Sequence, residues 1–531
     1  MVHAVFLKKG LSNIDIWGGM RLCFVEQRVG AYLTLRGQEM KSNLRQKTIC
    51  ILLAMFIITI GMPVSARGVQ FVSPSYSLRV ALGLDFSSAS FAVSEGNYEL
   101  IDYATQRIIS TNPGTGTWVV APKGAANLQL SYNGAAVEGL VNTHLVMRQK
   151  NREELNVFSF KNKRYRGDLL IQNINGKIQI INIVDVEKYL YGVVGAEMGI
   201  GAPDEAYKVQ AVVSRTYALF YMENPQLNYD VSNTTAYQVY GGYDSELTSG
   251  ARVKQAVDAT KGQTIYYDNK IIQAFFHSNS GGYTESCENV WTSNMPYLRA
   301  VAVPQDAYAA QVPQNGDWPA VSFAWQKSYT RQELSAALGK WNAEHPSEAI
   351  KVGEIQDLVA SRQAVDPVTK VYLPQETQSG RVTQLDFVGT SGVKSFFKDH
   401  IRSVLGLRST LFSVCFDSTI KLLTAFGSED TFNQTKELVA VNVDGYVSKL
   451  NGNNGNYYIQ GADGVTTMPK FFNSLKIEGK GYGHGLGMSQ WGAWGMAVSG
   501  MNYTTIIEHF YNQDKNDGRL KIISYQTAMN M

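Results

Sequence analysis

One carboxyl group stands alone in an apolar stretch of this chain. Glu197 is the only ionisable residue within residues 192–198, where its neighbours are Gly, Val, Ala and Met. A carboxyl group beside such side chains loses hydration, which raises its pKa and suits a general acid. The competing interpretation is an ordinary solvated glutamate, the commoner situation for this residue type. Glu197 is therefore a candidate acid that needs support from other parts of the sequence.

A polar loop at residues 277–291 supplies a second group of candidates. It begins with His277, is rich in hydroxyl side chains and ends with Trp291, a composition typical of the rim of a sugar-binding site. Ser280 does not lie in a G-x-S-x-G elbow, which argues against a serine hydrolase. His277 and Cys287 are weak candidates for metal ligands, because two ligands do not make a zinc site.

A glycine-rich run follows near the C-terminus. Glycine occupies every second position from 479 to 487, and His484 lies inside the run. Because glycine lacks a Cβ atom, it lets the backbone approach a ligand or another segment closely. The run contains neither G-x-x-x-x-G-K-[ST] nor G-x-G-x-x-G, so it is not a phosphate loop. Two interpretations remain: a ligand-binding loop, and a turn that packs two strands tightly.

Periodicity and capping predict the elements that position these residues. Apolar side chains at helical spacing over residues 186–193 predict a helix with Asp185 as its N-cap. A second helix is predicted after Pro203, running to about Glu223 with Arg215 in its middle. The alternative for such an arginine is an ordinary ion pair at the helix surface. Glu197 lies between these two helices.

Other segments give the rest of the architecture. Ser489 is placed to cap a short helix over residues 491–497. The predicted class is α+β and multi-lobed: a strand-rich N-terminal part, then an α+β core with a substrate groove. Further helices are predicted at 331–344 and 504–511, a turn at Asn175-Gly176, and strands at 89–93, 98–102, 107–110, 118–121 and 128–132.

The N-terminal segment predicts export. Residues 49–60 are apolar, basic residues precede them, and Val64-Ser65-Ala66 follows as a small-residue cleavage site. We therefore expect a signal peptide over 40–66, cleavage after Ala66, and an extracellular, wall-associated or membrane-anchored protein; a membrane anchor requires that the segment stays uncleaved. Residues 1–39 precede Met40, and we expect translation to start at Met40, with 1–39 an artefactual extension. A genuine cytoplasmic extension is the alternative.

Charge and cysteine content exclude several classes. The full chain has 48 basic and 45 acidic residues, and residues 1–66 hold eight and three of them, so the exported chain has 48 − 8 = 40 against 45 − 3 = 42. A formal charge of −2 gives no basic field for nucleic acid. Only Cys287 and Cys415 remain after residue 66, which is no disulfide framework.

Four blocks together resemble the SpoIID/LytB family, the stage II sporulation protein D group. They are residues 186–198, 208–218, 277–284 and 479–493, in the family's order, and residues 402–412 are also family-like. The domains expected are a β-rich region over 67–145 and a SpoIID/LytB-like core over 146–531, with a polar insertion at about 416–471. The extra sequence and the lack of visible cell-wall repeat modules are departures from many relatives.

The resemblance implies a peptidoglycan lytic transglycosylase, with glycan strands as substrate. Glu197 matches the family's catalytic glutamate, which would protonate the glycosidic oxygen and give a 1,6-anhydro product without a second carboxylate. Arg215 is expected to bind substrate or to reach Glu197 through an intermediary, since direct contact would lower the pKa of the acid. The full set of expected substrate-binding residues is Arg215, His277, Ser278, Ser280, Gly281, Tyr283, Lys480, His484 and Gln490.

The resemblance also leaves alternatives open. Some relatives bind a metal near the block at 277–284, but this chain offers only His277 and Cys287, so no cofactor is assigned and zinc is in doubt. Proteins of the LytB type include non-catalytic amidase enhancers, which makes a wall-binding protein with a cell-wall amidase as partner the competing class. A surface adhesin using the strands of 68–145 rests on composition alone.

Overall fold

The computed structural model describes residues 76–225, 227–312, 322–423 and 471–529, Pro74, and short strands within 14–22 and 429–469. The chain divides into two units, residues 1–70 and 71–531. In the first, β1 (Ile14–Ile16) pairs antiparallel with β2 (Met20–Leu22). The expected signal peptide at 40–66 lies outside the described residues. Among the described helices, none is long and apolar enough to cross a membrane.

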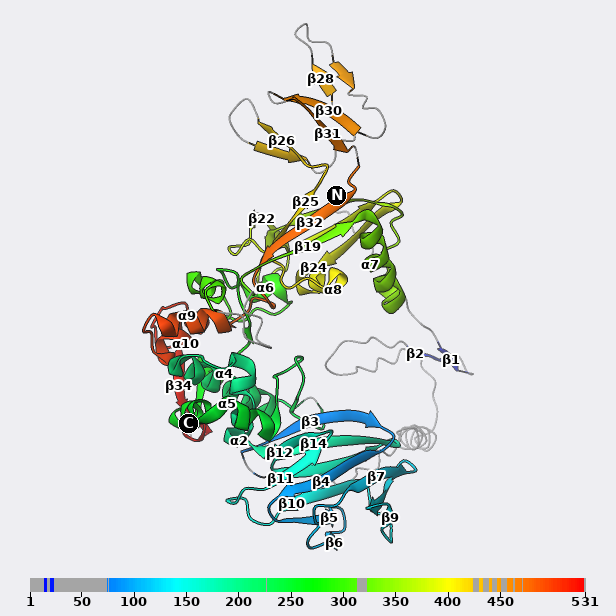
Figure 1. The fold of residues 1–531 in the computed structure, drawn as a ribbon, viewed down its shortest axis with the longest axis vertical. Coiled ribbons are helices and arrows are strands. Elements are labelled where there is room, and N and C mark those ends of the chain that lie inside the picture. The colour runs from blue at the N-terminus through cyan, green and yellow to red at the C-terminus, as the bar shows by residue number, and fades with distance from the viewer. Residues whose placement is uncertain are drawn as a thin grey trace, which may run out of the picture. The chain divides into compact units, whose positions relative to one another are not determined.

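Two sheets share one core; residues 77–185 form them, and β15 (Val231–Ser232) joins the larger one from further along the chain. The larger has the order β15-β3-β14-β13-β10-β5-β6 and the smaller β12-β11-β4-β7-β8-β9, seen in blue and cyan in Figure 1. Alternating apolar side chains from both sheets pack together, including Phe91, Leu145 and Phe158. The strands are β3 (Ser77–Phe86), β4 (Ala89–Glu95), β5 (Tyr98–Asp102), β6 (Arg107–Ser110), β7 (Trp118–Lys123), β8 (Asn127–Tyr132), β9 (Ala135–Ala136), β10 (His144–Gln149), β11 (Val157–Phe160), β12 (Lys163–Arg166), β13 (Asp168–Ile174), β14 (Lys177–Asp185) and β15 (Val231–Ser232).

The pairing of these strands corrects the domain boundary expected at 145/146. That boundary falls inside β10, and β10 pairs with β5 on one side and β13 on the other. The strands predicted between residues 89 and 132 are confirmed, but they need β10 to β14 to complete their sheets. Local strand signals locate strands without telling which distant strands will pair.

Four helices follow the sheets and carry the first two sequence blocks. They are α2 (Val186–Tyr191), α3 (Val194–Met198), α4 (Asp204–Glu223) and α5 (Gly242–Ala259). The Asp185 side chain caps α2 by accepting from the Glu187 and Lys188 N–H groups, as predicted. The limits of α4 are those expected from sequence, because its apolar stripe continues without a break from the first turn.

A third region has its own core, formed by residues 329–416 and 472–477. Its sheets have the orders β19-β32-β25 and β20-β23-β24. The elements are β19 (Ala324–Thr330), α7 (Arg331–Glu344), β20 (Ile355–Ser361), β21 (Gln363–Val365), β22 (Tyr372–Glu376), β23 (Gln384–Gly389), β24 (Gly392–Phe397), α8 (Ile401–Leu405), β25 (Phe412–Phe416) and β32 (Ser474–Lys480), with 3-10 helices at Pro346–Glu348 and Lys398–His400. A further 3-10 helix, Pro304–Ala310, lies outside this region and packs against the helix at Gln490–Val498.

The polar insertion at 416–471 contains three strand pairs where the structure describes it. These are β26 (Ile420–Leu423) with β27 (Glu429–Phe432), β28 (Val439–Val441) with β29 (Val447–Lys449), and β30 (Asn456–Gly461) with β31 (Gly464–Pro469). The chain then returns through β32 to the glycine run.

The remaining elements complete the α+β architecture, and three of them pack on α4. Ser489 caps α9 (Gln490–Val498) as predicted, its hydroxyl accepting from the Gly492 N–H. The others are β16 (Gln263–Tyr267), β17 (Lys270–Ile271), β18 (Phe276–His277), α6 (Cys287–Val290), β33 (Met488–Ser489), α10 (Tyr503–Asn512), β34 (Leu520–Ser524) and α11 (Tyr525–Met529). The three that pack on α4 are α9, α10 and β16.

Candidate active site

All four sequence blocks meet at Gln490, whose Nε2 also donates to Gln210 Oε1 at 3.4 Å. β18 pairs in parallel with β33, which sets His277 opposite Ser489. Two residues after Ser489, the Trp491 N–H donates to the Ser278 carbonyl at 3.0 Å. Gln490 Nε2 donates to the Glu197 carbonyl at 2.9 Å and lies 3.3 Å from Glu197 Oε2. The end of the glycine run, the polar loop and Glu197 are thus joined through neighbouring contacts.

The carboxyl group of Glu197 is held by neutral donors. The Val239 N–H donates to Oε1 at 2.6 Å, and the Gln490 side chain donates to Oε2 at 3.3 Å. Burial raises the pKa of Glu197 to about 7, although both hydrogen bonds act to lower it. Because a strong donor already engages Oε1, Oε2 is the oxygen suited to carry and transfer a proton.

Close-packed glycines bring the Val239 N–H to Glu197. A Cβ atom on Gly195 would lie 1.9 Å from Ser249 Oγ, so only glycine lets α3 approach α5 this closely. A Cβ atom on Gly192 would lie 2.7 Å from the Gly242 carbonyl. The Gly241 N–H donates to the Gly192 carbonyl at 3.0 Å, which ties the segment that carries Val239 to the end of α2. These glycines therefore serve the geometry of the acid.

Arg215 lies apart from this carboxyl group. Its guanidinium is fully buried and forms a two-point pair with Glu187, with Nε–Oε1 at 2.9 Å and Nη2–Oε2 at 2.6 Å. Glu187 also accepts from the Tyr76 hydroxyl and the Gly262 N–H. The expected substrate contact of Arg215 is corrected: a side chain with no exposed surface cannot reach a polymer. Its position supports an ion pair that joins α2 to α4.

The polar loop is anchored by Asp306, which no sequence signal singled out. Asp306 Oδ2 accepts from the Ser280 N–H at 3.1 Å and the Gly282 N–H at 3.0 Å, and Oδ1 accepts from the Ser489 hydroxyl. Burial raises the pKa of Asp306 to about 6. His277 is also internal: Nδ1 contacts the Leu486 carbonyl and Nε2 the Ser280 hydroxyl. His277, Ser280 and Gly281 are therefore buried supports in this structure.

Ser278 differs from its neighbours in the loop. Its Oγ is buried and has no hydrogen-bond partner among the described residues. A buried hydroxyl without a partner costs free energy unless something else satisfies it. Its backbone carbonyl accepts from the Trp491 N–H, so Ser278 lies beside the segment that carries Gln490.

The glycine run is a packing seam. Cβ atoms on Gly481, Gly483 and Gly487 would lie 2.7 Å from the Asn279 carbonyl, 2.7 Å from His277 Cβ and 2.0 Å from the Phe275 carbonyl. All three have positive φ. The Asn279 and Tyr482 backbones also exchange hydrogen bonds of 3.1 and 2.8 Å. Of the two interpretations of the run, tight packing of two segments is the one observed.

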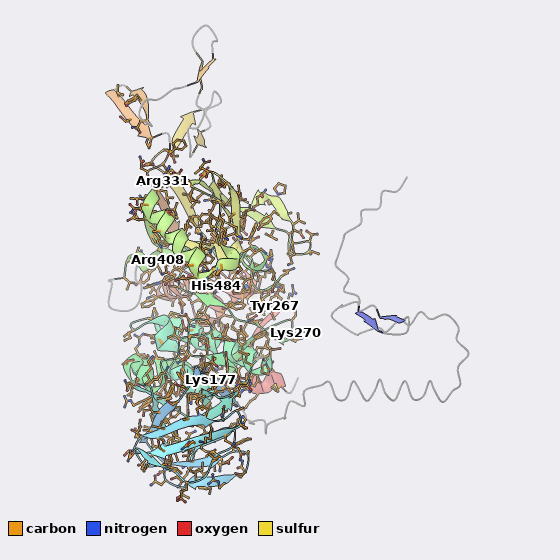
Figure 2. The ribbon with its side chains drawn as sticks, turned by 90° about the vertical axis from the view of Figure 1, so that its right-hand side faces the viewer. Lys177, Tyr267, Lys270, Arg331, Arg408 and His484 are labelled. Carbon is orange, nitrogen blue, oxygen red and sulfur yellow. The ribbon has the colours of Figure 1, made fainter. Side chains whose placement is uncertain are left out.

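His484 extends this seam with an aromatic cluster. Its ring, labelled in Figure 2, lies 5.2 Å from Trp291 and 5.4 Å from His277 between centroids. Burial lowers the pKa of His484 to about 4, and its Nδ1 accepts from the Leu486 N–H at 3.0 Å. His484 is thus neutral near pH 7 and acts as an aromatic and hydrogen-bonding group.

The comparisons with known proteins agree with the sequence blocks. Residues 174–267 match the family model described as SpoIID, stage II sporulation protein. The chain is 29% identical over 326 residues to the amidase enhancer of Bacillus subtilis (strain 168), covering 61% of this chain and 39% of that protein. It is 27% identical over 341 residues to stage II sporulation protein D of Bacillus amyloliquefaciens, covering 62% and 73%. For stage II sporulation protein D of Bacillus subtilis the identity is 31% over 194 residues, covering 33% and 55%.

The chain is thus similar to SpoIID proteins at residues 174–267, and to the stage II sporulation proteins D and the amidase enhancer over a longer stretch. The family match spans Glu197 and Arg215, while the glycine run lies beyond it. Two other residues carried over from the SpoIID/LytB motifs lie at the surface or near it: Lys480 is exposed, and Tyr283 is half-buried with its hydroxyl 3.5 Å from Gln378 Nε2. Neither forms a hydrogen bond with Glu197 in the described chain.

The metal occasionally expected in this family does not fit the residues present. Both nitrogens of His277 are engaged in hydrogen bonds. Burial raises the pKa of the Cys287 thiol to about 11, which disfavours the thiolate that a metal requires. No group of three His, Cys, Asp or Glu residues suitable for a metal ion occurs among the described residues. We assign no step to a metal.

Proposed function

We propose that this chain is a peptidoglycan lytic transglycosylase that cleaves the bond between N-acetylmuramic acid and N-acetylglucosamine. The match of residues 174–267 to the SpoIID family model and the names of the relatives support a cell-wall-related role. The observation that carries the finer proposal is the state of Glu197. Its pKa of about 7 lets one carboxyl group donate a proton and take one back near neutral pH.

The proposed reaction needs only this carboxyl group. Glu197 donates the proton on Oε2 to the glycosidic oxygen as the bond from that oxygen to muramoyl C1 breaks. The muramoyl C6 hydroxyl then attacks C1, and its proton passes to the Glu197 carboxylate. The acid is regenerated, and one fragment ends in 1,6-anhydromuramic acid. Intramolecular attack uses no water, so a second carboxylate to activate water is not required.

The position of the acid fits both steps. The Val239 N–H on Oε1 fixes the carboxyl plane, and Gln490 fixes the backbone of Glu197 through the carbonyl. A fixed plane keeps Oε2 aimed at one place while the proton leaves and returns. The neutral amide of Gln490 does this without the charge that would hold Glu197 ionised.

Export completes the proposal, because the substrate lies outside the cytoplasm. We expect the chain to begin at Arg67 after cleavage and to act at the cell wall, including the wall remodelling of sporulation. N-terminal sequencing of the protein from its host tests this part. A form that retains Met40 would show an uncleaved membrane anchor, and peptides from 1–39 would show a genuine extension.

Product analysis tests the chemistry. Purified glycan strands without stem peptides are incubated with residues 67–531, and the fragments are identified by mass spectrometry. Fragments that end in 1,6-anhydromuramic acid are expected. Ordinary reducing ends would mean hydrolysis and would require a second carboxylate that activates water.

A second candidate function is supported by one relative, which is named an amidase enhancer. In that case the chain would bind glycan strands and stimulate a separate amidase without cleaving them. Stimulation of an added cell-wall amidase by the Glu197→Gln variant, together with no cleavage by the wild type, would favour this function.

A further inference from the structure

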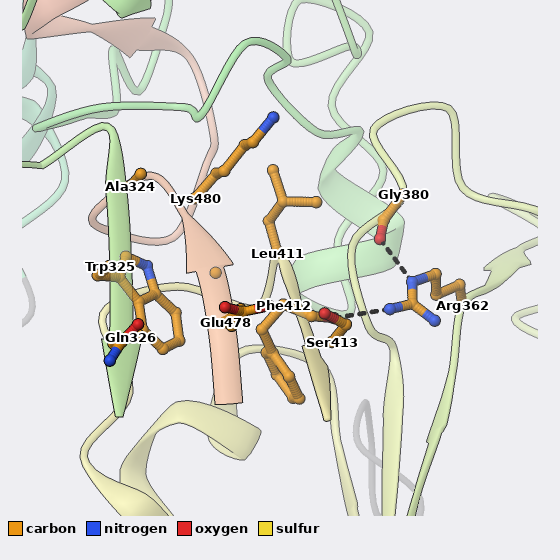
Figure 3. Close-up of a pocket in the computed structure, with 11 residues that line it drawn as sticks. Ala324, Trp325, Gln326, Arg362, Gly380, Leu411, Phe412, Ser413, Glu478 and Lys480 are labelled. Carbon is orange, nitrogen blue, oxygen red and sulfur yellow. Dashed lines mark hydrogen bonds between the residues drawn. The ribbon is translucent and has the colours of Figure 1, made fainter. Parts of the chain in front are cut away.

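A cavity of about 700 Å³ lies at one end of the β19-β32-β25 sheet, outside the residues that contact Glu197. Its size is within the range of small-molecule sites. Figure 3 shows Trp325 and Arg362 on opposite sides, with Glu478, Leu411 and Phe412 between them. Both apolar and hydrogen-bonding side chains line it, and a sugar ring presents both kinds of surface.

The Trp325 indole is held in place by the glycine run. A Cβ atom on Gly479 would lie 2.2 Å from Trp325 Cζ2, so the indole lies across the space that any other residue would fill. Its Nε1 donates to the Gly481 carbonyl at 2.9 Å. Trp325 is half-buried and lines the cavity. A fixed aromatic ring at a half-open cavity is a platform for an apolar face of a ligand.

The three charged residues that line the cavity differ in whether another group already neutralises or fixes them. Arg362 donates to the Gly380 carbonyl at 3.0 Å and the Phe412 carbonyl at 2.6 Å, which fixes its guanidinium. Glu478 pairs with Lys476 at 2.5 Å. Lys480 is exposed and forms no ion pair within the described ranges. The lining therefore holds two cations, Arg362 and Lys480, and one carboxylate, that of Glu478, which already pairs with Lys476; this excess of positive charge favours a ligand with a carboxylate.

Lys480 also connects the cavity to the candidate active site. A Cβ atom on Gly281 would lie 2.8 Å from Lys480 Cβ, so the two backbones are in close contact. Gly281 belongs to the loop that holds Gln490 through Ser278 and Trp491. The backbone that lines the cavity at Lys480 is therefore packed directly against the loop that also contacts the candidate active site.

We propose that this cavity binds a section of the glycan strand away from the point of cleavage, with a sugar ring against Trp325 and a sugar carboxylate beside Lys480. The identity of the ligand rests on the proposed function, while binding itself does not require cleavage. The muramic acid carboxylate supplies the charge, and chitin oligomers, built from N-acetylglucosamine alone, lack it.

Calorimetry with the Glu197→Gln protein tests the cavity without loss of ligand to cleavage. The probes are a peptide-free muramic-acid-containing tetrasaccharide and chitotetraose. Trp325→Ala is expected to weaken binding of both by about tenfold, and Gly479→Ala should reproduce this loss by displacing the indole. Lys480→Gln should weaken only the muramic-acid tetrasaccharide. Lys351→Gln, an exposed lysine in the same region that does not line the cavity, is the matched control and should change neither.

Unchanged affinities in Trp325→Ala, Gly479→Ala and Lys480→Gln, with circular dichroism showing folded proteins, would overturn the proposal. Tighter binding of a free stem peptide than of either saccharide would also overturn it. The two proposals fail separately. If the wild type binds saccharides through Trp325 but does not cleave strands, the transglycosylase proposal is wrong and the cavity proposal stands. If strands are cleaved and the cavity variants change neither cleavage nor binding, the cavity proposal is wrong and the transglycosylase proposal stands.

Discussion

Two glutamates ten residues apart have opposite surroundings. Glu187 in α2 is buried against the Arg215 guanidinium, which satisfies both of its oxygens. Glu197 in α3 meets a backbone N–H and a neutral amide, and burial raises its pKa to about 7. The nearby cation makes the first carboxylate a structural group, and the missing cation leaves the second able to hold a proton. The partner of a carboxyl group, more than its burial, decides which role it has.

Removing the acidic proton of Glu197 should have the largest effect of the changes that test this comparison. Glu197→Gln keeps the shape of the side chain and its contact with Val239, but it cannot donate a proton. Cleavage of glycan strands should fall by at least the 10²–10⁴-fold that general acid–base catalysis typically contributes, since Glu197 serves in both steps. Product release measured by mass spectrometry checks this. A variant that retains a tenth of wild-type activity would place the acid elsewhere.

Removing the Arg215 guanidinium should lower the stability of the fold, because this group does not contact Glu197. Arg215→Ala leaves Glu187 buried without its partner, and breaking a buried pair costs about 3–5 kcal/mol. Urea unfolding of residues 67–531 measures this loss. Arg252→Ala is the control, because its pair with Asp204 is exposed on both sides and should contribute about 0–1 kcal/mol. Equal losses of stability in Arg215→Ala and Arg252→Ala would show that the buried pair contributes no more than an exposed one.

The sequence predicted the elements around both glutamates well, because their signals are local. The Asp185 cap, the apolar stripe of α4 and the Ser489 cap depend on residues within a few positions of one another. The pairing of Arg215 with Glu187 was beyond such reasoning. It joins positions 28 apart and depends on how α2 and α4 pack.

The residues of the site that were not predicted from sequence also act through contacts between distant positions of the chain. Val239 contributes a backbone N–H, which leaves no trace in the type of its side chain. Asp306 follows an ordinary Val-Pro-Gln segment, yet it holds the backbone of the loop at Ser280 and Gly282. The glycine run was visible as a pattern, but only the fold shows which atoms its glycines face. Sequence located the acid and not the groups that orient it.

The packing seam that brings Gln490 to Glu197 offers a smaller test. Gly487→Ala adds a Cβ atom 2.0 Å from the Phe275 carbonyl and should cost about 1–3 kcal/mol through overpacking. Gly500 also has positive φ, at 88°, but nothing lies within 4 Å of a Cβ atom there. Gly500→Ala therefore measures backbone strain alone. The difference in urea midpoints gives the packing contribution, and equal midpoints would mean that the seam relaxes freely.

A cation placed beside Glu197 would make its surroundings similar to those of Glu187. Gln490→Lys places a cation near Oε2, as Arg215 stands near Glu187, and should lower the pKa of Glu197. Gln490→Met is the uncharged control: it removes a hydrogen bond that lowers the pKa, so any shift should be upward. The alkaline limb of kcat/KM against pH reports both. A limb that stays in place in Gln490→Lys would show that Glu197 is not the titrating acid.

The wild-type pH dependence is the smallest effect, and its sign follows from the raised pKa. A general acid must be protonated, so activity should fall above pH 7 by about tenfold per unit. Stability follows the same proton. Because the folded pKa exceeds the ordinary value of 4.5, the contribution of the protonated group is complete below pH 4.5 and is lost as pH rises through 7. Glu197→Gln lacks this titration, so its stability relative to wild type should rise between pH 4.5 and 8. Thermal unfolding of both proteins across that range measures it, and a constant difference would mean that the carboxyl group is as well solvated in the folded chain as in the unfolded one.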